Sequence, residues 1–320
     1  MSVRSFATLA AAWSLAAAAA AVHAQDYPTQ PVALTVNFPP AGVTDLVARS
    51  LGTAMAPLLK QPVIVENRAG AGGAIGVTAV ANAPRDGYHL GFLSIAALTA
   101  LPQMRSVPYH IDSLAYICRA FEAPVFLLVA PGSRFHDTKS VVAYAKANPG
   151  RLNYATVGPG SLPHLAALDF AAKAGITITH IPYQGEAPAV TDLLGGHVDL
   201  YFGTSAVAST HRLRRLGVAA ESRAADAKDV PTLAELGYPV SWSVVGGMIA
   251  PAGIDAKVRQ TLEQACSEAV KTPAYRSALA QLQLVSAYAN GADFKSQVLR
   301  EAGMDRVILK SAGLLQASGN

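Results

Sequence analysis

Short apolar runs of strand type alternate with stretches of helical periodicity along most of this chain, and this alternation constrains the fold most. In residues 42–59, for example, large apolar side chains recur near the 3.6-residue spacing of a helix. Such alternation indicates βαβ units, in which helices cover parallel sheets. The predicted strands are 32–37, 63–66, 90–93, 125–129, 152–155, 176–181 and 198–202; the predicted helices are 42–59, 73–81, 139–147, 162–173 and 187–194, and the chain from Asp255 onward is mostly helical.

Two similar segments suggest that the chain forms two lobes rather than one large sheet. Residues 123–132 and 244–253 are apolar, and each ends in a turn containing proline and glycine. They would serve as crossings between a discontinuous first lobe and an inserted second lobe, and two crossings permit hinge closure. The predicted boundaries are 25–123 for the first part of lobe 1, 124–245 for lobe 2, and 246–320 for the return to lobe 1.

The N-terminus has the pattern of a secretory signal peptide. Arg4 precedes an apolar, alanine-rich run over 9–22, and small residues lead up to a cleavage site expected between Ala24 and Gln25. The alternative is a membrane anchor, but the run is shorter than the ~20 apolar residues that a span needs. We therefore expect residues 1–24 to be removed and the rest to be soluble in the periplasm.

Composition narrows the possible functions. The chain is 51% hydrophobic and 14% charged, which argues against disorder, and its net charge of +4 is too thin and too scattered for a nucleic-acid-binding surface. Two cysteines, Cys118 and Cys266, would both fall in lobe 1; an oxidising compartment permits a disulfide, and two buried thiols are the alternative. Without CxxC, HExxH or HxH patterns, no metal or cofactor site is expected.

Two loops between a predicted strand and a predicted helix are candidates for ligand binding. In residues 37–45 the free N–H groups at the helix start would attract an anion such as a carboxylate, although Thr44 and Asp45 are also ordinary helix-capping residues. Residues 156–164 offer a second glycine-rich helix start. There Ser161 has prolines where a nucleophile elbow needs glycines, and His164 is a base, a ligand donor or an internal cap.

A third glycine-rich segment, residues 68–76, fits neither nucleotide-binding pattern. Counted from Gly70, the sixth position of the dinucleotide fingerprint is Ile75, and no GKS or GKT follows for a phosphate-binding loop. A tight turn with close helix packing explains these glycines better.

Several motifs together resemble the substrate-binding proteins of tripartite tricarboxylate transporters, also called the Bug family of periplasmic solute receptors. In order and spacing the resemblance covers nearly the whole chain after residue 25. The matching segments are Tyr27-Pro28, Phe38-Pro39-Pro40-x-Gly42-x-x-Asp45, Val65-Glu66-Asn67-Arg68, Asp86-Gly87-Tyr88, Gly160-Ser161-x-Pro163-His164-Leu165, His180-Ile181-Pro182-Tyr183-Gln184-Gly185, Asp192-Leu193-Leu194-Gly195-Gly196, Asp229-Val230-Pro231-Thr232 and Ala250-Pro251-Ala252-Gly253.

The resemblance implies a two-lobed α/β fold of the type II periplasmic-binding-protein (Venus flytrap) class, with a ligand cleft between the lobes. It implies a monomeric, non-enzymatic receptor that holds a small carboxylate with ordered water and presents it to membrane transporter subunits. The ligand-binding positions that it implies are Phe38, Pro39, Gly42, Thr44, Asp45, Thr156, Gly158, Gly160, Ser161 and His164, with Ser94 and Gly203 at other strand ends.

The chain departs from the family pattern at two positions of the first loop. Ala41 stands where a second glycine is usual, and Asn37 where proline is frequent, so these positions bear on which ligand binds rather than on the binding role. Two other functions remain open: a secreted α/β hydrolase that would use His164 with a cleft carboxylate such as Asp45, and a ligand sensor for a signalling partner.

Overall fold

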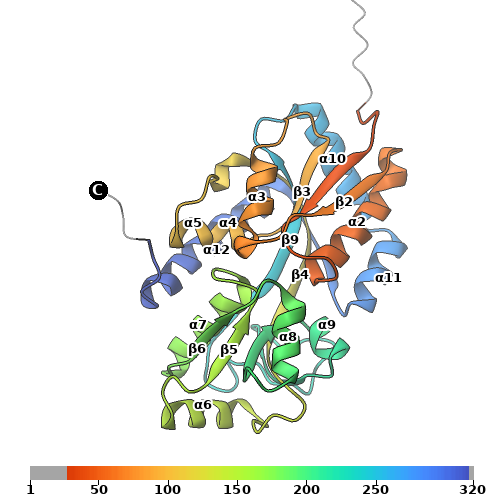
Figure 1. The fold of residues 1–320 in the computed structure, drawn as a ribbon. Helices are drawn as coiled ribbons and strands as arrows, with labels where there is room; N and C mark the ends of the chain where they lie inside the picture. The colour runs from red at the N-terminus through yellow and green to blue at the C-terminus, as the bar shows by residue number, and fades with distance from the viewer. Residues whose placement is uncertain (1–26, 317–320) are drawn as a thin grey trace, which may run out of the picture.

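The structure is a computed structural model that describes residues 27–316, and it contains two α/β lobes joined by long strands (Figure 1). The predicted leader, residues 1–24, lies outside the described residues. Between residues 27 and 316 no helix is long and apolar enough to cross a bilayer.

The first lobe is built on a mixed sheet in the order β2-β1-β3-β9-β4, with β10 also paired to β4. The β1–β2 and β1–β3 pairs are parallel, as the βαβ pattern predicts, and the later pairs are antiparallel. These strands are β1 (Val32–Val36), β2 (Val63–Asn67), β3 (His89–Ser94), β4 (Leu114–Val129), β9 (Ser243–Pro251) and β10 (Val285–Asn290).

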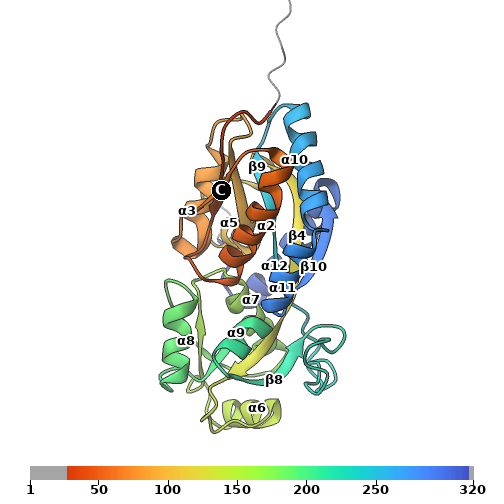
Figure 2. The same ribbon diagram turned by 90° about the vertical axis from the view of Figure 1, so that its right-hand side faces the viewer.

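The second lobe uses the far end of β4 as its own strand. That end pairs with β7 and β8, and β7 continues through β5 to β6. The strands of this lobe are β5 (Asn153–Thr156), β6 (Thr179–Pro182), β7 (Leu200–Gly203) and β8 (Arg214–Ala219). Figure 2 shows β4 running from the upper lobe into the lower one, where β8 lies beside it.

Pro124 marks the point where β4 changes its partners. Pro124 is opposite Ser243 at the end of the β4–β9 ladder, and the next residue, Val125, is opposite Ala219 of β8. A proline cannot donate to a ladder, so its position at the change of partners leaves both sheets intact.

Helices cover both faces of each sheet. In the first lobe, α2, α10 and α11 share one core with the sheet, and α3, α4 and α12 contribute to another. In the second lobe, α6 and α7 cover one face, and α8 and α9 the other. The helices are α2 (Val43–Leu59), α3 (Ala74–Ala81), α4 (Ala96–Thr99), α5 (Leu101–Met104), α6 (Thr138–Ala147), α7 (Leu162–Ala174), α8 (Glu186–Leu194), α9 (Ser205–Thr210), α10 (Ala256–Ala269), α11 (Pro273–Gln281) and α12 (Gly291–Ser311), with 3₁₀ turns η1 (Ala71–Gly73) and η2 (Ile111–Ser113).

The C-terminal helix α12 packs on both lobes. Phe294 and Val298, near its start, belong to a first-lobe core, whereas Leu309, near its end, is buried in a core of the second lobe.

The structure differs from the sequence-based expectation mainly along β4, which begins at Leu114 rather than at residue 125. Arg119 and Glu122 interrupt the apolar pattern there, but they pair with each other at 2.6 Å inside the strand. Strands β8 and β10 were not predicted, and β6 begins at Thr179 rather than at residue 176.

Cys118 and Cys266 form a disulfide, which resolves the alternative that the sequence left open. Their Cα atoms are 6.6 Å apart, and the bond joins β4 to α10 within the first lobe. Both side chains are fully buried, and 148 residues separate them in sequence.

We expect the disulfide to stabilise the folded state. A bridge closing so long a loop contributes about 2–5 kcal/mol to the free energy of unfolding. The Cys118→Ala/Cys266→Ala variant should lose this amount in urea unfolding, and reduced wild-type protein should lose a similar amount. Thiol titration of the denatured, unreduced protein should find no free thiol; two free thiols would contradict the bridge.

Two acidic residues lie one turn apart on α12: Asp305 is buried, and Glu301 is partly buried and accepts a hydrogen bond from Gln297. Asp305 is 1% exposed, and no partner within the described residues binds either of its carboxylate oxygens. Burial raises the pKa of Asp305 to about 7. Burial, with the charge of Asp305, raises the pKa of Glu301 to about 8.

These raised pKa values predict that the protein is less stable in weak base. In the unfolded chain both groups lose their protons near pH 4, whereas the folded protein keeps them to about pH 7–8. The free energy of unfolding therefore falls as pH rises from about 4 to about 8. In urea unfolding at pH 8, Asp305→Asn should therefore have a free energy of unfolding about 1–3 kcal/mol higher than the wild type. At pH 4 the free energy of unfolding of this variant should show no such gain. The exposed Glu221→Gln serves as the control; an equal gain at both pH values would contradict the prediction.

Candidate functional site

A cavity of about 410 Å³ lies between the two lobes and takes its walls from both. The first lobe contributes the loop after β1, the start of α2 and the end of β3. The second lobe contributes the loops that follow β5, β6 and β7. The lining residues are 38–44, 94, 157, 162–163, 184–188, 201–204, 210–211 and 244.

The first-lobe wall presents the uncapped start of α2. Gly42 is the N-cap and makes no side-chain cap, and Leu46 donates the first intrahelical bond, to the carbonyl of Gly42. No acceptor within the described residues is recorded for the N–H groups of Val43 and Thr44, and both residues line the cavity. Free N–H groups at the positive end of a helix dipole are a natural place for an anion.

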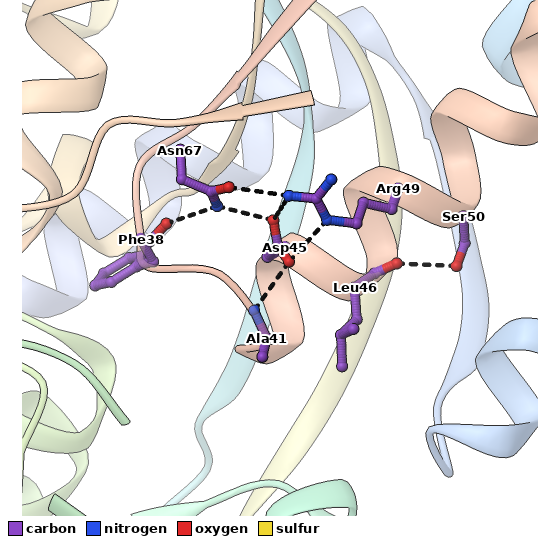
Figure 3. A network of polar contacts seen from close by, with 7 residues as sticks. All are labelled: Phe38, Ala41, Asp45, Leu46, Arg49, Ser50 and Asn67. Carbon is purple, nitrogen blue, oxygen red and sulfur yellow. Dashed lines mark hydrogen bonds and ion pairs between the residues drawn. The ribbon is translucent and has the colours of Figure 1, made fainter. Parts of the chain in front are cut away.

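Among the residues predicted to bind ligand, Asp45 does not line the cavity. Its carboxylate accepts bonds from the N–H of Ala41 at 2.9 Å, from the Arg49 guanidinium at 2.9 and 3.0 Å, and from the Asn67 amide at 2.8 Å (Figure 3). Burial acts to raise the pKa of Asp45, but these hydrogen bonds outweigh it and hold the pKa below its usual value. Asp45 therefore positions the loop that forms the cavity wall.

Asn37 fixes the same loop from its other side. Its side-chain amide donates to the carbonyl of Ser94 and accepts from the N–H of Ser94, at 3.3 and 3.2 Å. The Asn37 amide, at the position where the family pattern often has proline, is thus hydrogen-bonded to the backbone of the same lobe. A Cβ on Gly73 or Gly76 would lie within 2.7 Å of Asn37, which confirms that these glycines serve close packing.

The second-lobe loop, 156–164, uses most of its polar groups internally. The Ser161 hydroxyl donates to the carbonyl of Gly158 at 2.6 Å, and the N–H of Gly160 donates to Nδ1 of His164 at 3.1 Å. The Thr156 hydroxyl pairs with Nε2 of His180 at 2.7 Å. None of Thr156, Gly158, Gly160, Ser161 and His164 lines the cavity; Val157, Leu162 and Pro163 do so instead.

The glycines of this loop instead allow the lobes to approach each other. Gly160 has a φ of +72°, and a Cβ there would lie 2.7 Å from the Leu101 side chain of the first lobe. Pro159 likewise approaches Gly72 of the first lobe closely. This loop therefore makes a contact between the lobes and also contributes Val157, Leu162 and Pro163 to the cavity wall.

His164 is a neutral, internal residue. It stacks on His180, with ring centroids 4.2 Å apart. Burial, together with His180, lowers the pKa of His164 to about 3. A histidine that is buried and already accepts a backbone hydrogen bond is a poor general base, so the hydrolase alternative loses its catalytic residue.

Of the residues predicted to bind ligand, six lie on the cavity wall: Phe38, Pro39, Gly42, Thr44, Ser94 and Gly203. The sequence reasoning missed Gln184, Glu186 and Thr204, which follow strands of the second lobe, and Tyr201, which lies within β7. The strand-end rule that selected Gly203 also applies to Thr204 and could have found it.

Thr204 is the clearest of the missed residues. It is 2% exposed, it lines the cavity, and its hydroxyl has no partner among the described residues. Buried hydroxyls without a partner are rare in folded proteins, so this one is free to bind a ligand. Between residues 27 and 316 no cluster of metal-binding side chains occurs.

Comparison with known proteins places this geometry in one family. The family model described as "Tripartite tricarboxylate transporter family receptor" matches residues 47–314. Protein BugT of Bordetella pertussis is 37% identical over 273 residues, covering 82% of this chain and 83% of BugT.

Two solved structures are similar over their whole length. The periplasmic binding protein BugD is 29% identical, with a TM-score of 0.84, and the match covers 91% of this chain and 100% of BugD. MatC from Rhodopseudomonas palustris, solved with bound malate, is 26% identical, with a TM-score of 0.82 over 88% of this chain and 100% of MatC. This chain belongs to the Bug-type receptors of the tripartite tricarboxylate transporter family, which are two-lobed solute-binding proteins and not enzymes.

Proposed function

We propose that this receptor closes its two lobes on a small carboxylate in the periplasm and presents it to a tripartite tricarboxylate-type transporter. The observation that carries the proposal is the uncapped start of α2, whose free N–H groups lie on the cavity wall. The bound malate of MatC supports a carboxylate as the ligand class.

Backbone and hydroxyl groups, rather than cations, would bind the carboxylate. No lysine or arginine is among the described residues that line the cavity. The N–H groups of Val43 and Thr44 on one wall face a cavity whose other wall carries the hydroxyl of Thr204. Hydrogen bonds to a carboxylate from such groups are stronger than neutral ones, and ordered water can complete the set.

Other parts of the proposal depend on regions or states beyond the cavity. A leader over residues 1–24 would direct the chain to the periplasm and would be removed on export. The two crossings near residues 124 and 245 would let the lobes, taken as 25–123 with 246–320 and as 124–245, open and close as a monomer around the ligand.

Removing one N–H group at the start of α2 should weaken binding without disturbing the helix. Val43 is the first helical residue, and Gly42 before it has φ −76° and ψ 164°, the extended conformation that precedes a proline. Val43→Pro should therefore raise the dissociation constant roughly 10- to 150-fold, the loss of one hydrogen bond to a charged group.

Isothermal calorimetry with the tightest ligand of a panel of small carboxylates, malate included, measures this loss. Val43→Ala keeps the N–H group and is the matched control. Equal affinity of the two variants would place the carboxylate elsewhere.

Removing the Thr204 hydroxyl should separate binding from stability. Thr204→Val keeps the side-chain shape and removes a buried polar group that lacks a partner, so the melting temperature of the free protein should not fall. The affinity for the same ligand should fall about 10-fold or more if the hydroxyl binds the carboxylate.

Ser205→Ala is the control for this experiment, because the Ser205 hydroxyl is also buried and unpartnered but does not line the cavity. It should bind with wild-type affinity. Loss of affinity in both variants to the same degree would indicate an effect of packing rather than of ligand contact.

A further inference from the structure

Glu186 introduces a negative charge into a cavity that also presents anion-binding N–H groups. It is the first residue of α8, and it lines the cavity beside Ala187 and Pro188. The Tyr201 hydroxyl, which also lines the cavity, donates to its carboxylate at 3.3 Å. Besides Glu186 and Tyr201, His211 is the titratable residue on the described wall, and it is solvent-exposed.

The carboxylate of Glu186 has no cationic partner within the described cavity. The aromatic rings, prolines and alanines around it cannot compensate a charge, and burial raises the pKa of Glu186 to about 7. A charge in such surroundings is costly unless a counter-charge or a proton neutralises it. Within the described residues the chain provides one hydrogen bond, from the Tyr201 hydroxyl, and the partial positive charge at the start of α8.

Glu186 lies within the same ligand volume as the start of α2. A Cβ on Gly185 would lie 2.9 Å from the Pro39 ring, so the loop before Glu186 touches the first-lobe loop that leads to α2. The cavity of about 410 Å³ thus joins an anion-attracting wall to a cation-attracting one. A single small molecule that binds both walls therefore needs an anionic group for the start of α2 and a cationic group for Glu186.

We propose that the ligand is a carboxylate that also bears a protonated amine, with the amine donating to Glu186 and the carboxylate accepting from the start of α2. This inference rests on the proposed function and narrows its ligand class. Tyr201 is a positioning residue, because its hydroxyl holds the Glu186 carboxylate from the side of β7.

Matched pairs of ligands that differ only in the amine test the proposal. Calorimetry compares alanine with propionate and 4-aminobutyrate with butyrate, so that two separations of amine and carboxylate are sampled, and malate represents the dicarboxylates. In the wild type the better aminated ligand should bind roughly 10- to 150-fold more tightly than its partner, as for a charge-assisted hydrogen bond. Glu186→Gln should abolish this preference, and the control Glu221→Gln, at an exposed site, should retain it.

Proton exchange gives a second readout that does not depend on a variant. At pH 7, an amine bound to Glu186 should release protons to the buffer, so the binding enthalpy varies with the ionisation enthalpy of the buffer. A protonated Glu186 that donates to a second carboxylate would instead take protons up when malate binds.

The failures of the two proposals are distinguishable. The amine inference is overturned if malate binds more tightly than the aminated ligands and takes up protons, or if Glu186→Gln keeps the amine preference of the wild type. Either result leaves the carboxylate receptor standing. If no carboxylate of any kind binds the folded wild type, the proposed function fails and the inference fails with it.

Discussion

The architecture depends on one strand that belongs to two sheets. β4 pairs with β9 along its first part and with β7 and β8 along its last part, and Pro124 lies where these partners change. The ends of β5 and β7 therefore face the end of β1 across a shared cavity, although these segments are far apart in sequence. The carboxyl ends of strands are where open α/β sheets place their ligands. In this protein the carboxyl-end edges of both sheets border the same cavity.

The two walls of the cavity use the same kind of loop in different ways. The loop before α2 fixes itself through side chains and leaves its helix N–H groups free. The loop before α7 turns its hydroxyl and its histidine inward, and its glycines allow contact with the first lobe. The polar side chains that the second lobe leaves toward the cavity consequently include Glu186 and Thr204, in the loops after β6 and β7.

Sequence reasoning succeeded where the signal is local. The helix over 42–59 and the free start of α2 follow from periodicity and loop composition, and the structure has that helix at Val43–Leu59. The early part of β4 was missed because Arg119 and Glu122 look exposed until each is seen as the partner of the other. The sequence left several roles open for Ser161 and His164, and the structure uses both locally: Ser161 donates to Gly158, and His164 accepts from Gly160. The stacking of His164 on His180 and the contact of Gly160 with Leu101 could not be predicted, because the fold brings these residues from distant segments.

The anchoring of the loop between β1 and α2 has a consequence for the energetics of binding. Asn67 donates to the carbonyl of Phe38 at 3.0 Å, Asp45 holds Ala41 in a left-handed conformation with φ 66°, and Asn37 is tied to Ser94. Ordering a flexible backbone costs about 1–2 kcal/mol per residue, and binding to a mobile loop would have to offset that loss. These contacts lie wholly within the chain, so the first-lobe half of the site is preorganised and the entropy of ordering this loop is lost on folding rather than on binding.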